Sequence, residues 1–406
     1  MLLPRHLVLL LAGVSGPALA EPARGYVDLH VHLAAHLTVP VYGAGPEAKP
    51  PAGLTNRHGL SAHLFASQLE APGPSLLVSL AYANPFATVF ETKVSMWARL
   101  ERQLAYVEAF VSRHSARFGF ARTPEEARAI ITSGRTAVVH GLEGATLVLD
   151  SPEDAARWAA RGVAVITPVH LADNELGGAW CQGGDLAILN LPGCQRERRD
   201  PMQHGLTAAG KARLHDLVDV GIIIDMAHLS DASFSEAAAI LRERSAAPVY
   251  THVTADAVRP DPTALTDAQL REIAALGGLA GVTANQMHLP PLSAAALPAD
   301  HCRGSVDDFA LHWAHIVSVT GGAPLGWGSD FQGGVAHIGP KYGPRGCAAA
   351  PAGRAANAFD LSGLAHAGMV QPMFDALAAA GADLAPLLSS TEQFLTVWER
   401  DRRLRR

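Results

Sequence analysis

Residues 26–33 read YVDLHVHL, an apolar run that ends in two histidines one residue apart. Side chains in an extended strand alternate between its two faces, so we expect His30 and His32 to point to the same side. Two imidazoles on one face suit a shared cation. The pattern also fits two histidines that only form hydrogen bonds at a strand end, so the rest of the chain has to decide between the two interpretations.

Further apolar runs of strand length follow, separated by stretches rich in Ala, Leu, Glu and Arg. We predict eight strands, at 26–33, 75–82, 136–143, 163–171, 221–229, 248–253, 278–284 and 324–331. Helices are predicted over 93–114, 151–162 and 266–278, with Ser151 and Thr266 as N-caps. Near-continuous apolar strands that alternate with helices indicate a parallel sheet covered by helices. The sequence therefore predicts a (β/α)8 barrel, with a doubly wound open sheet as the alternative.

Composition and the N-terminus narrow the class of protein. A net charge of −6 over 406 residues gives no basic field for nucleic acid, which excludes that class of partner. Residues 1–20 resemble a signal peptide, with a short basic start, an apolar stretch and an Ala-Leu-Ala cleavage pattern. We therefore expect an exported protein, periplasmic or secreted, whose residues 21–406 form one domain without a membrane span. The sequence does not decide between a monomer and a homodimer.

The chain has four cysteines. An oxidising compartment favours disulfides over thiolate metal sites. We expect two loop staples, Cys181–Cys194 and Cys302–Cys347, although three pairings are open from sequence alone.

Ionisable residues collect near the C-terminal ends of the predicted strands. They are His30, His32, Glu143, His170, His228, His252 and Asp330. Each alone could be a helix cap, a turn residue or a hydrogen-bonded core residue. A barrel would gather all of them into one ring, where burying so many ionisable groups without compensating charge is costly. A pair of divalent cations would compensate, and neutral imidazoles with a bridging carboxylate suit zinc.

In this order the motifs resemble the membrane dipeptidase (renal dipeptidase) family of the amidohydrolase superfamily. The similarity rests on H-x-H at 30–32, LEG at 142–144, TPVH at 167–170 followed by Asn174, DMAHLS at 225–230, APVYTH at 247–252 and GWGSDFQG at 326–333. FLTVWE at 394–399 extends it to the C-terminal region.

This resemblance implies a zinc-dependent dipeptidase that uses a metal-bridging hydroxide. His30 and His32 would bind one zinc ion, His228 and His252 the other, and Glu143 would bridge them. His170 would contact the substrate carbonyl and stabilise the oxyanion, with Asn174 as a further substrate contact. Asp330 would be the acid/base residue.

Two departures from the family pattern concern the metals and the substrate. The family has H-x-D where this chain has His30-Val31-His32. It also has an Arg-Asn pair, whose arginine binds the substrate carboxylate, where this chain has Thr263-Ala264. Arg259 is the nearest candidate to replace that arginine. Alternatives are a binuclear metal hydrolase of another small amide or lactone, and a non-catalytic exported binding protein. We expect the remaining histidines, His288 among them, at the surface or around the site.

Overall fold

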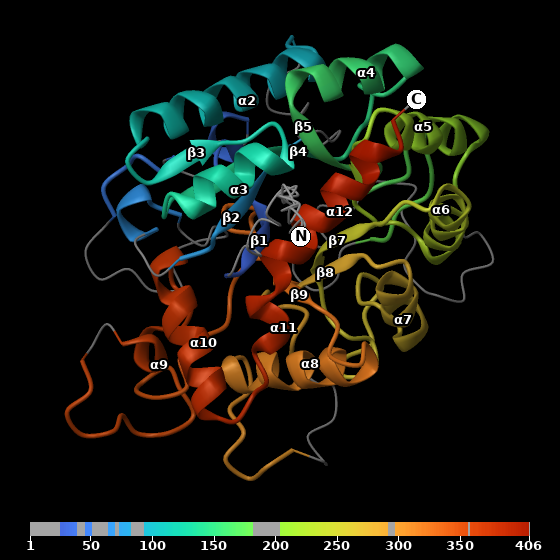
Figure 1. Ribbon diagram of the computed structural model, residues 1–406. Helices are drawn as coiled ribbons and strands as arrows, with labels where there is room; N and C mark the ends of the chain where they lie inside the picture. The colour runs from blue at the N-terminus through green and yellow to red at the C-terminus, as the bar shows by residue number, and fades with distance from the viewer. Residues whose placement is uncertain are drawn as a thin grey trace, which may run out of the picture.

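A computed structural model describes residues 25–38, 45–50, 64–69, 73–82, 93–181, 204–290, 297–355 and 358–405. Eight parallel strands follow one another around a nearly closed barrel in the order β6-β5-β4-β2-β1-β9-β8-β7 (Figure 1). Their bounds are β1 Val27–Val31, β2 Leu76–Tyr82, β4 Thr136–Glu143, β5 Val163–Thr167, β6 Ile223–Ile224, β7 Val249–Val253, β8 Leu279–Val282 and β9 Leu325–Trp327. A bridge between Asp225 and Val249 links β6 to β7. The predicted barrel is confirmed, and the open sheet is excluded.

Helices cover the outside of the barrel. They are α2 Met96–Arg113, α3 Pro124–Thr132, α4 Pro152–Arg161, α5 Ala208–Asp219, α6 Asp231–Arg244, α7 Asp267–Ala275 and α8 Val306–Val319. The two predicted N-caps are confirmed, since Ser151 and Thr266 each form a capping box with the residue three positions later. After β9 come α9 Phe359–Ser362, α10 Val370–Ala379, α11 Ala385–Leu388 and α12 Ser390–Arg403, with short 3-10 turns at Ala35–Leu37, Ala66–Gln68 and Ala367–Met369.

Several strands are shorter than predicted. β5 ends at Thr167 because Pro168 has no N–H to donate to a neighbouring strand. β6 has only two residues, and the rest of the predicted run 221–229 turns into the loop that carries His228. A further strand, β3 Phe118–Phe120, was not predicted and pairs with β4 off the barrel path. Three residues are too short for an alternating pattern to be seen.

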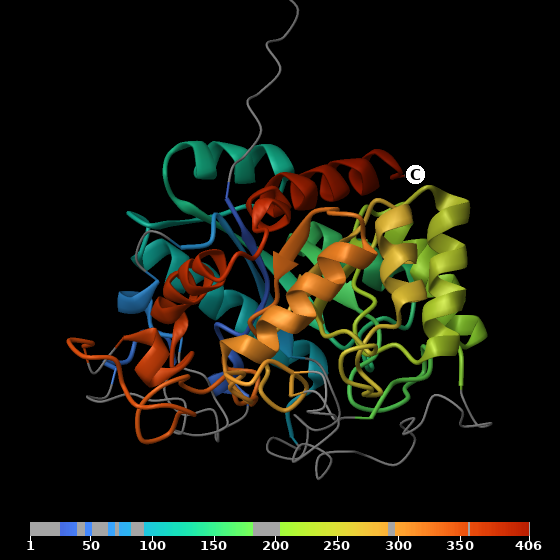
Figure 2. The ribbon, with the colours of Figure 1, turned by 90° about the horizontal axis from the view of Figure 1, so that it is seen from below.

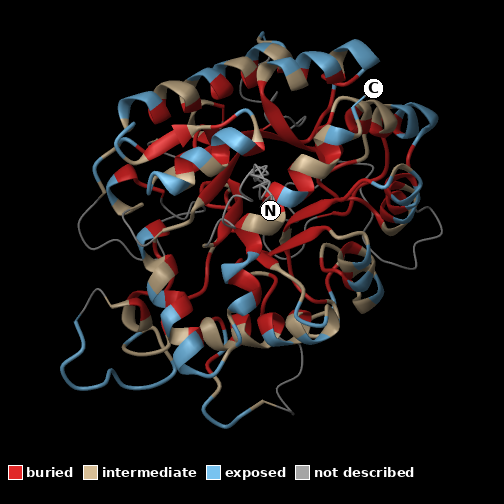
Figure 3. Cartoon of the chain, viewed as in Figure 1, coloured by how far each residue is buried: buried red, intermediate tan, exposed pale blue. Residues whose placement is uncertain are grey.

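Helix α12 closes the N-terminal end of the barrel. Phe394, Leu395 and Trp398 are buried in one apolar cluster with residues from the beginnings of the strands, among them Val27 and Leu279. Figure 2 shows α12 lying across this end, and the burial colours of Figure 3 show buried strands beneath it. The opposite end, where the strands finish, is therefore the one open to a ligand.

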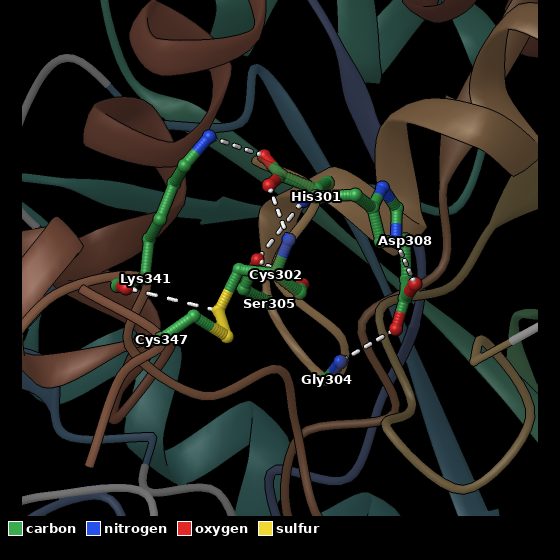
Figure 4. The surroundings of a disulfide bond; sticks show 8 residues. His301, Cys302, Gly304, Ser305, Asp308, Lys341 and Cys347 are labelled. Atoms are coloured by element: carbon green, nitrogen blue, oxygen red, sulfur yellow. Dashed lines mark hydrogen bonds and ion pairs between the residues drawn. A yellow bond between two sulfur atoms is a disulfide. The ribbon is translucent and has the colours of Figure 1, made fainter. Parts of the chain in front are cut away.

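A disulfide joins Cys302, just before α8, to Cys347 in the loop after β9, as predicted (Figure 4). Ion pairs reinforce this link, with Lys341 Nζ 2.9 Å from Asp307 and the buried His301 2.7 Å from Asp308. The predicted Cys181–Cys194 pairing involves Cys194, which lies outside the described residues, as does the predicted signal peptide. No helix among the described residues is both long and apolar enough to span a bilayer.

Candidate metal centre

The predicted ligands meet at the C-terminal end of the barrel around the carboxylate of Glu143, the last residue of β4. Its Oε1 lies 3.2 Å from His30 Nε2 and 3.3 Å from His228 Nε2, and its Oε2 lies 3.3 Å from His32 Nε2. Two groups result, His30–His32–Glu143 and Glu143–His228–His252, each with ligand atoms within 4.8 Å of one another. Glu143 is the shared member, which is the arrangement expected of a residue that bridges two cations.

The hydrogen bonds on the far side of the rings indicate which nitrogens are free to bind a metal. His32 Nδ1 lies 3.1 Å from the carbonyl oxygen of Leu80, which can only accept, so Nδ1 carries the proton. Thr251 donates its hydroxyl proton to Asp225 Oδ2 at 2.8 Å and can therefore accept from His30 Nδ1 at 2.9 Å. In the neutral rings the lone pairs then sit on the two Nε2 atoms, which lie 3.1 Å apart. Two lone pairs that face each other and a carboxylate fit a cation between them.

Charge in the cluster supports the same conclusion. Burial lowers the pKa values of His170 and His252 well below their ordinary value, so both rings are neutral. Burial also lowers the pKa of His32, but hydrogen bonds to Asp330 and Glu143 outweigh it and raise that pKa to about 10. Burial raises the pKa of Glu143, yet the surrounding histidines hold it well below its ordinary value. The carboxylates of Glu143 and Asp330 therefore favour a positive charge between the histidines, which a metal ion can supply in place of a proton.

The two predicted catalytic residues lie beside this cluster. His170 Nε2 is 3.6 Å from Glu143 Oε1, and Asp330 Oδ1 is 3.4 Å from His32 Nε2. Asp330 has a left-handed backbone with φ 54°, and His228 has φ 65°. Left-handed backbone is unfavourable for residues other than glycine and tends to persist at functional sites. A Cβ on Gly333 would lie 1.6 Å from Asp330 Oδ1, so only glycine leaves room for this carboxylate.

A cavity opens above the cluster, and two predicted substrate contacts do not line it. The side chain of Asn174 is used within its own loop, where it donates to the Pro168 carbonyl and accepts from the N–H groups of Leu176 and Gly177. Arg259 donates to the carbonyl oxygen of Pro290 at 2.7 Å. Neither is among the residues that line the cavity, so the structure does not bring them to the predicted position.

Other residues that the sequence analysis did not assign to the site line this cavity. They are Tyr82, Leu171, Tyr250, Thr254, Thr263, Thr283, Asn285, His288, Gly333 and Val335. Several come from strand ends or the loops that follow them, where the barrel expectation alone places residues near the site. Tyr250 and Thr254 flank the predicted ligand His252 at intervals of two, and this alternation is the one signal in the sequence that could have found them.

Comparisons with known proteins place the chain in a family. The model of the membrane dipeptidase family, peptidase family M19, matches residues 75–340. Dipeptidase verJ of Clonostachys rogersoniana is 26% identical over 57% of this chain and 52% of its own, and dipeptidase ataJ of Aspergillus terreus is 28% identical over 57% and 55%. The chain thus spans about half the length of these curated relatives.

Two solved structures show the same fold. The probable dipeptidase PvdM from Pseudomonas aeruginosa has a TM-score of 0.69 at 17% identity, covering 94% of this chain and 96% of its own. A metallo peptidase from Rhodobacter sphaeroides, solved with a phosphinate mimic of the dipeptide L-Ala-D-Ala, has a TM-score of 0.67 at 19% identity, covering 93% and 99%. With the family match across residues 75–340, these findings show that the chain belongs to the membrane dipeptidase family, peptidase family M19.

Proposed function

We propose that the protein is a dipeptidase that uses two zinc ions. The observation that carries the proposal is the position of Glu143, whose two carboxylate oxygens lie 3.2 and 3.3 Å from the Nε2 atoms of His30 and His32 and whose Oε1 also lies 3.3 Å from His228 Nε2. Family membership supports peptide hydrolysis, and the imidazole-rich ligand set supports zinc.

His30 and His32 would hold one ion, His228 and His252 the other, and Glu143 both. When bound, such a pair supplies Lewis acidity that makes a shared water acidic and polarises a carbonyl. Asp330 is placed to take the proton of the attacking water and to deliver it to the leaving amine nitrogen. Neutral His170 can donate a hydrogen bond to the carbonyl oxygen as negative charge develops on it.

A second candidate function is hydrolysis of a small amide or lactone that has no free carboxylate. It is favoured by one observation: among the described residues that line the cavity there is no Arg or Lys. Thr263 lies there instead, as the departure from the family motif predicts. A dipeptide panel with matched dipeptide amides separates the two functions.

We also propose that the mature chain is exported. The apolar N-terminal stretch with its cleavage pattern supports this, and so does the Cys302–Cys347 disulfide, since disulfides persist mainly in oxidising compartments.

The test of function is hydrolysis of a dipeptide panel by the purified mature chain, before and after chelation and after zinc is restored. We expect activity that chelation removes and zinc restores. A folded protein that holds two zinc ions and cleaves none of the dipeptides or dipeptide amides would overturn the proposal.

A further inference from the structure

The turn that carries Asp330, residues 329–333, has an unusual backbone. Asp330 and Gln332 are both left-handed, with φ 54° and φ 63°. Left-handed backbone is unfavourable for residues other than glycine and persists where surrounding contacts hold it. The position of the proposed acid/base carboxylate therefore depends on the contacts that this turn makes with the rest of the barrel.

One set of contacts comes from β1. Ser329 donates its N–H to Asp28 Oδ1 at 3.0 Å and its hydroxyl to the carbonyl oxygen of His30 at 2.9 Å. The N–H of Asp330 donates to the same carbonyl oxygen at 2.8 Å. The turn is thus tied to the strand that carries a candidate metal-binding histidine.

A second set of contacts comes from His337, which is only 1% exposed. Its Nε2 lies 2.5 Å from the carbonyl oxygen of Ser329. The same ring stacks on Phe331, with the two centroids 4.8 Å apart and the planes at 18° to each other. His337 therefore contacts both residues that flank Asp330, although it is not among the residues that line the cavity.

The hydrogen bond to Ser329 also fixes the state of the His337 ring. A carbonyl oxygen can only accept, so Nε2 carries the proton. Burial lowers the pKa of His337, so the ring is neutral and has one N–H. Because that N–H is donated to Ser329, His337 can support the turn but does not itself supply a proton to the reaction.

The backbone around His337 is fixed to the loop after β8. His337 forms an antiparallel bridge with Asn285, which lines the cavity. The N–H of Gln286 donates to the carbonyl oxygen of Ala336 at 2.8 Å. A side chain on a backbone held in this way can keep a neighbouring group within the narrow range of positions that catalysis needs.

We infer that His337 is the positioning residue that holds the carboxylate of Asp330 at the metal cluster. It acts through the two residues on either side of Asp330, and in the position that it maintains Oδ1 lies 3.4 Å from His32 Nε2. This inference rests on the proposed function, because it assumes that Asp330 transfers the proton. A displacement of about 1 Å at a reacting group can lower a rate by about 100-fold.

The test is steady-state hydrolysis by His337→Phe of whichever dipeptide or dipeptide amide the wild-type protein cleaves, with zinc content measured on the same samples. Phenylalanine keeps a ring that can stack on Phe331 but cannot donate to Ser329. We expect kcat to fall by about 10- to 100-fold. KM and zinc content should change little, because the residues that line the cavity and the candidate metal-binding residues are all retained.

His337→Gln is the rescue variant. Its side-chain amide can donate to the carbonyl oxygen of Ser329, so kcat should lie well above that of His337→Phe. A residue needed only for stability would instead change kcat in step with the melting temperature, which is measured for each variant.

His140→Phe is the matched control. His140 is another fully buried histidine beside a phenylalanine, with its ring centroid 4.3 Å from that of Phe120, and it does not line the cavity. This change should leave kcat unaltered. If His337→Phe does not fold, Phe331→Leu removes the stacked ring and should lower kcat in the same direction.

A folded His337→Phe variant with the kcat of wild type would overturn the inference. So would a loss that appears in KM or in zinc content instead of kcat, or a His337→Gln variant no more active than His337→Phe. The proposed function fails in a different way, through a zinc-loaded wild-type protein that cleaves no member of the panel, and the inference then fails with it.

Discussion

The two ends of the barrel bury ionisable groups in opposite ways. At the C-terminal end, Glu143 is surrounded by imidazoles that hold its pKa far below the ordinary value. At the N-terminal end, α12 packs on the strands through apolar side chains, and the carboxylate of its buried Asp401 accepts one hydrogen bond from the described residues, from the N–H of Ala247 at 3.2 Å. Burial there raises the pKa of Asp401 to about 7. One scaffold thus keeps a closed apolar end for stability and an open charged end for chemistry.

The largest effect should follow a change at the charged end that leaves the closed end untouched. Asp330→Asn keeps the shape of the side chain but cannot take a proton, so kcat should fall by about two to four orders of magnitude. Steady-state hydrolysis of a cleaved dipeptide measures this, with the melting temperature as a check on folding. Turnover close to that of wild type would remove Asp330 from the acid/base role.

A change at the closed apolar end should instead lower stability and leave catalysis unchanged. Leu395 is fully buried under the barrel, so Leu395→Ala should lower the free energy of unfolding by about 2–5 kcal/mol and leave KM unchanged. Leu388→Ala is the matched control, because Leu388 is 59% exposed on neighbouring α11. Denaturant unfolding measures both variants. Equal destabilisation by the two changes would contradict the assignment of α12 as the closing element.

A smaller effect should follow a change to a residue that holds a candidate metal-binding histidine in place. Thr251→Val removes the hydroxyl that lies 2.9 Å from His30 Nδ1 and 3.1 Å from His252 Nδ1, so metal affinity should fall by about 10- to 100-fold. Thr167→Val is the control, since Thr167 donates to the same Asp225 oxygen without contacting His30. Competition with a chromophoric chelator measures the affinity. If both variants lose affinity equally, Asp225 is responsible and not the contacts of Thr251 with His30 and His252.

The smallest expected effect concerns pH. Because the pKa of Asp401 is raised from 3.8 to about 7 on folding, the folded chain holds a proton that the unfolded chain has lost between these values. Stability from this group therefore falls as pH rises from about 4 to about 7. Asp401→Asn should flatten that part of the curve of melting temperature against pH. An unchanged slope would contradict the raised pKa of Asp401 in the folded chain.

The barrel was predictable because eight apolar runs alternate with helices. The order of these elements was enough to predict the fold, although several strands are shorter than the apolar runs. Prediction from the sequence failed where tertiary contacts decide whether a segment forms a strand. The run 221–229 has an apolar pattern, yet only Ile223 and Ile224 pair as a strand, because the chain then turns to direct His228 at Glu143. The isolated β3 has no signal in its three residues.

The candidate metal-binding residues were predictable because they interrupt apolar strands, where a buried ionisable side chain needs a compensating partner. Most of the other residues that line the cavity above them were not predictable. Arg259 was predicted to bind the substrate because of its charge and its position in the sequence, but its guanidinium donates a hydrogen bond to the carbonyl oxygen of Pro290. His288 had no signal, since its partner Asp261 lies 27 positions earlier in another loop and only the fold brings them to 3.1 Å.

Whether Glu143 bridges a pair of metal ions is tested most directly by elemental analysis of the metal content of the purified protein, from cells grown with zinc, and of variants that each lack one ligand. We expect about two zinc ions per chain in wild type, about one in His30→Ala and in His228→Ala, and a larger loss in Glu143→Gln, because Glu143 is shared by both groups. Wild-type protein without bound transition metal, or a Glu143→Gln variant that retains both ions as tightly as wild type, would contradict the claim that Glu143 bridges a pair of metals.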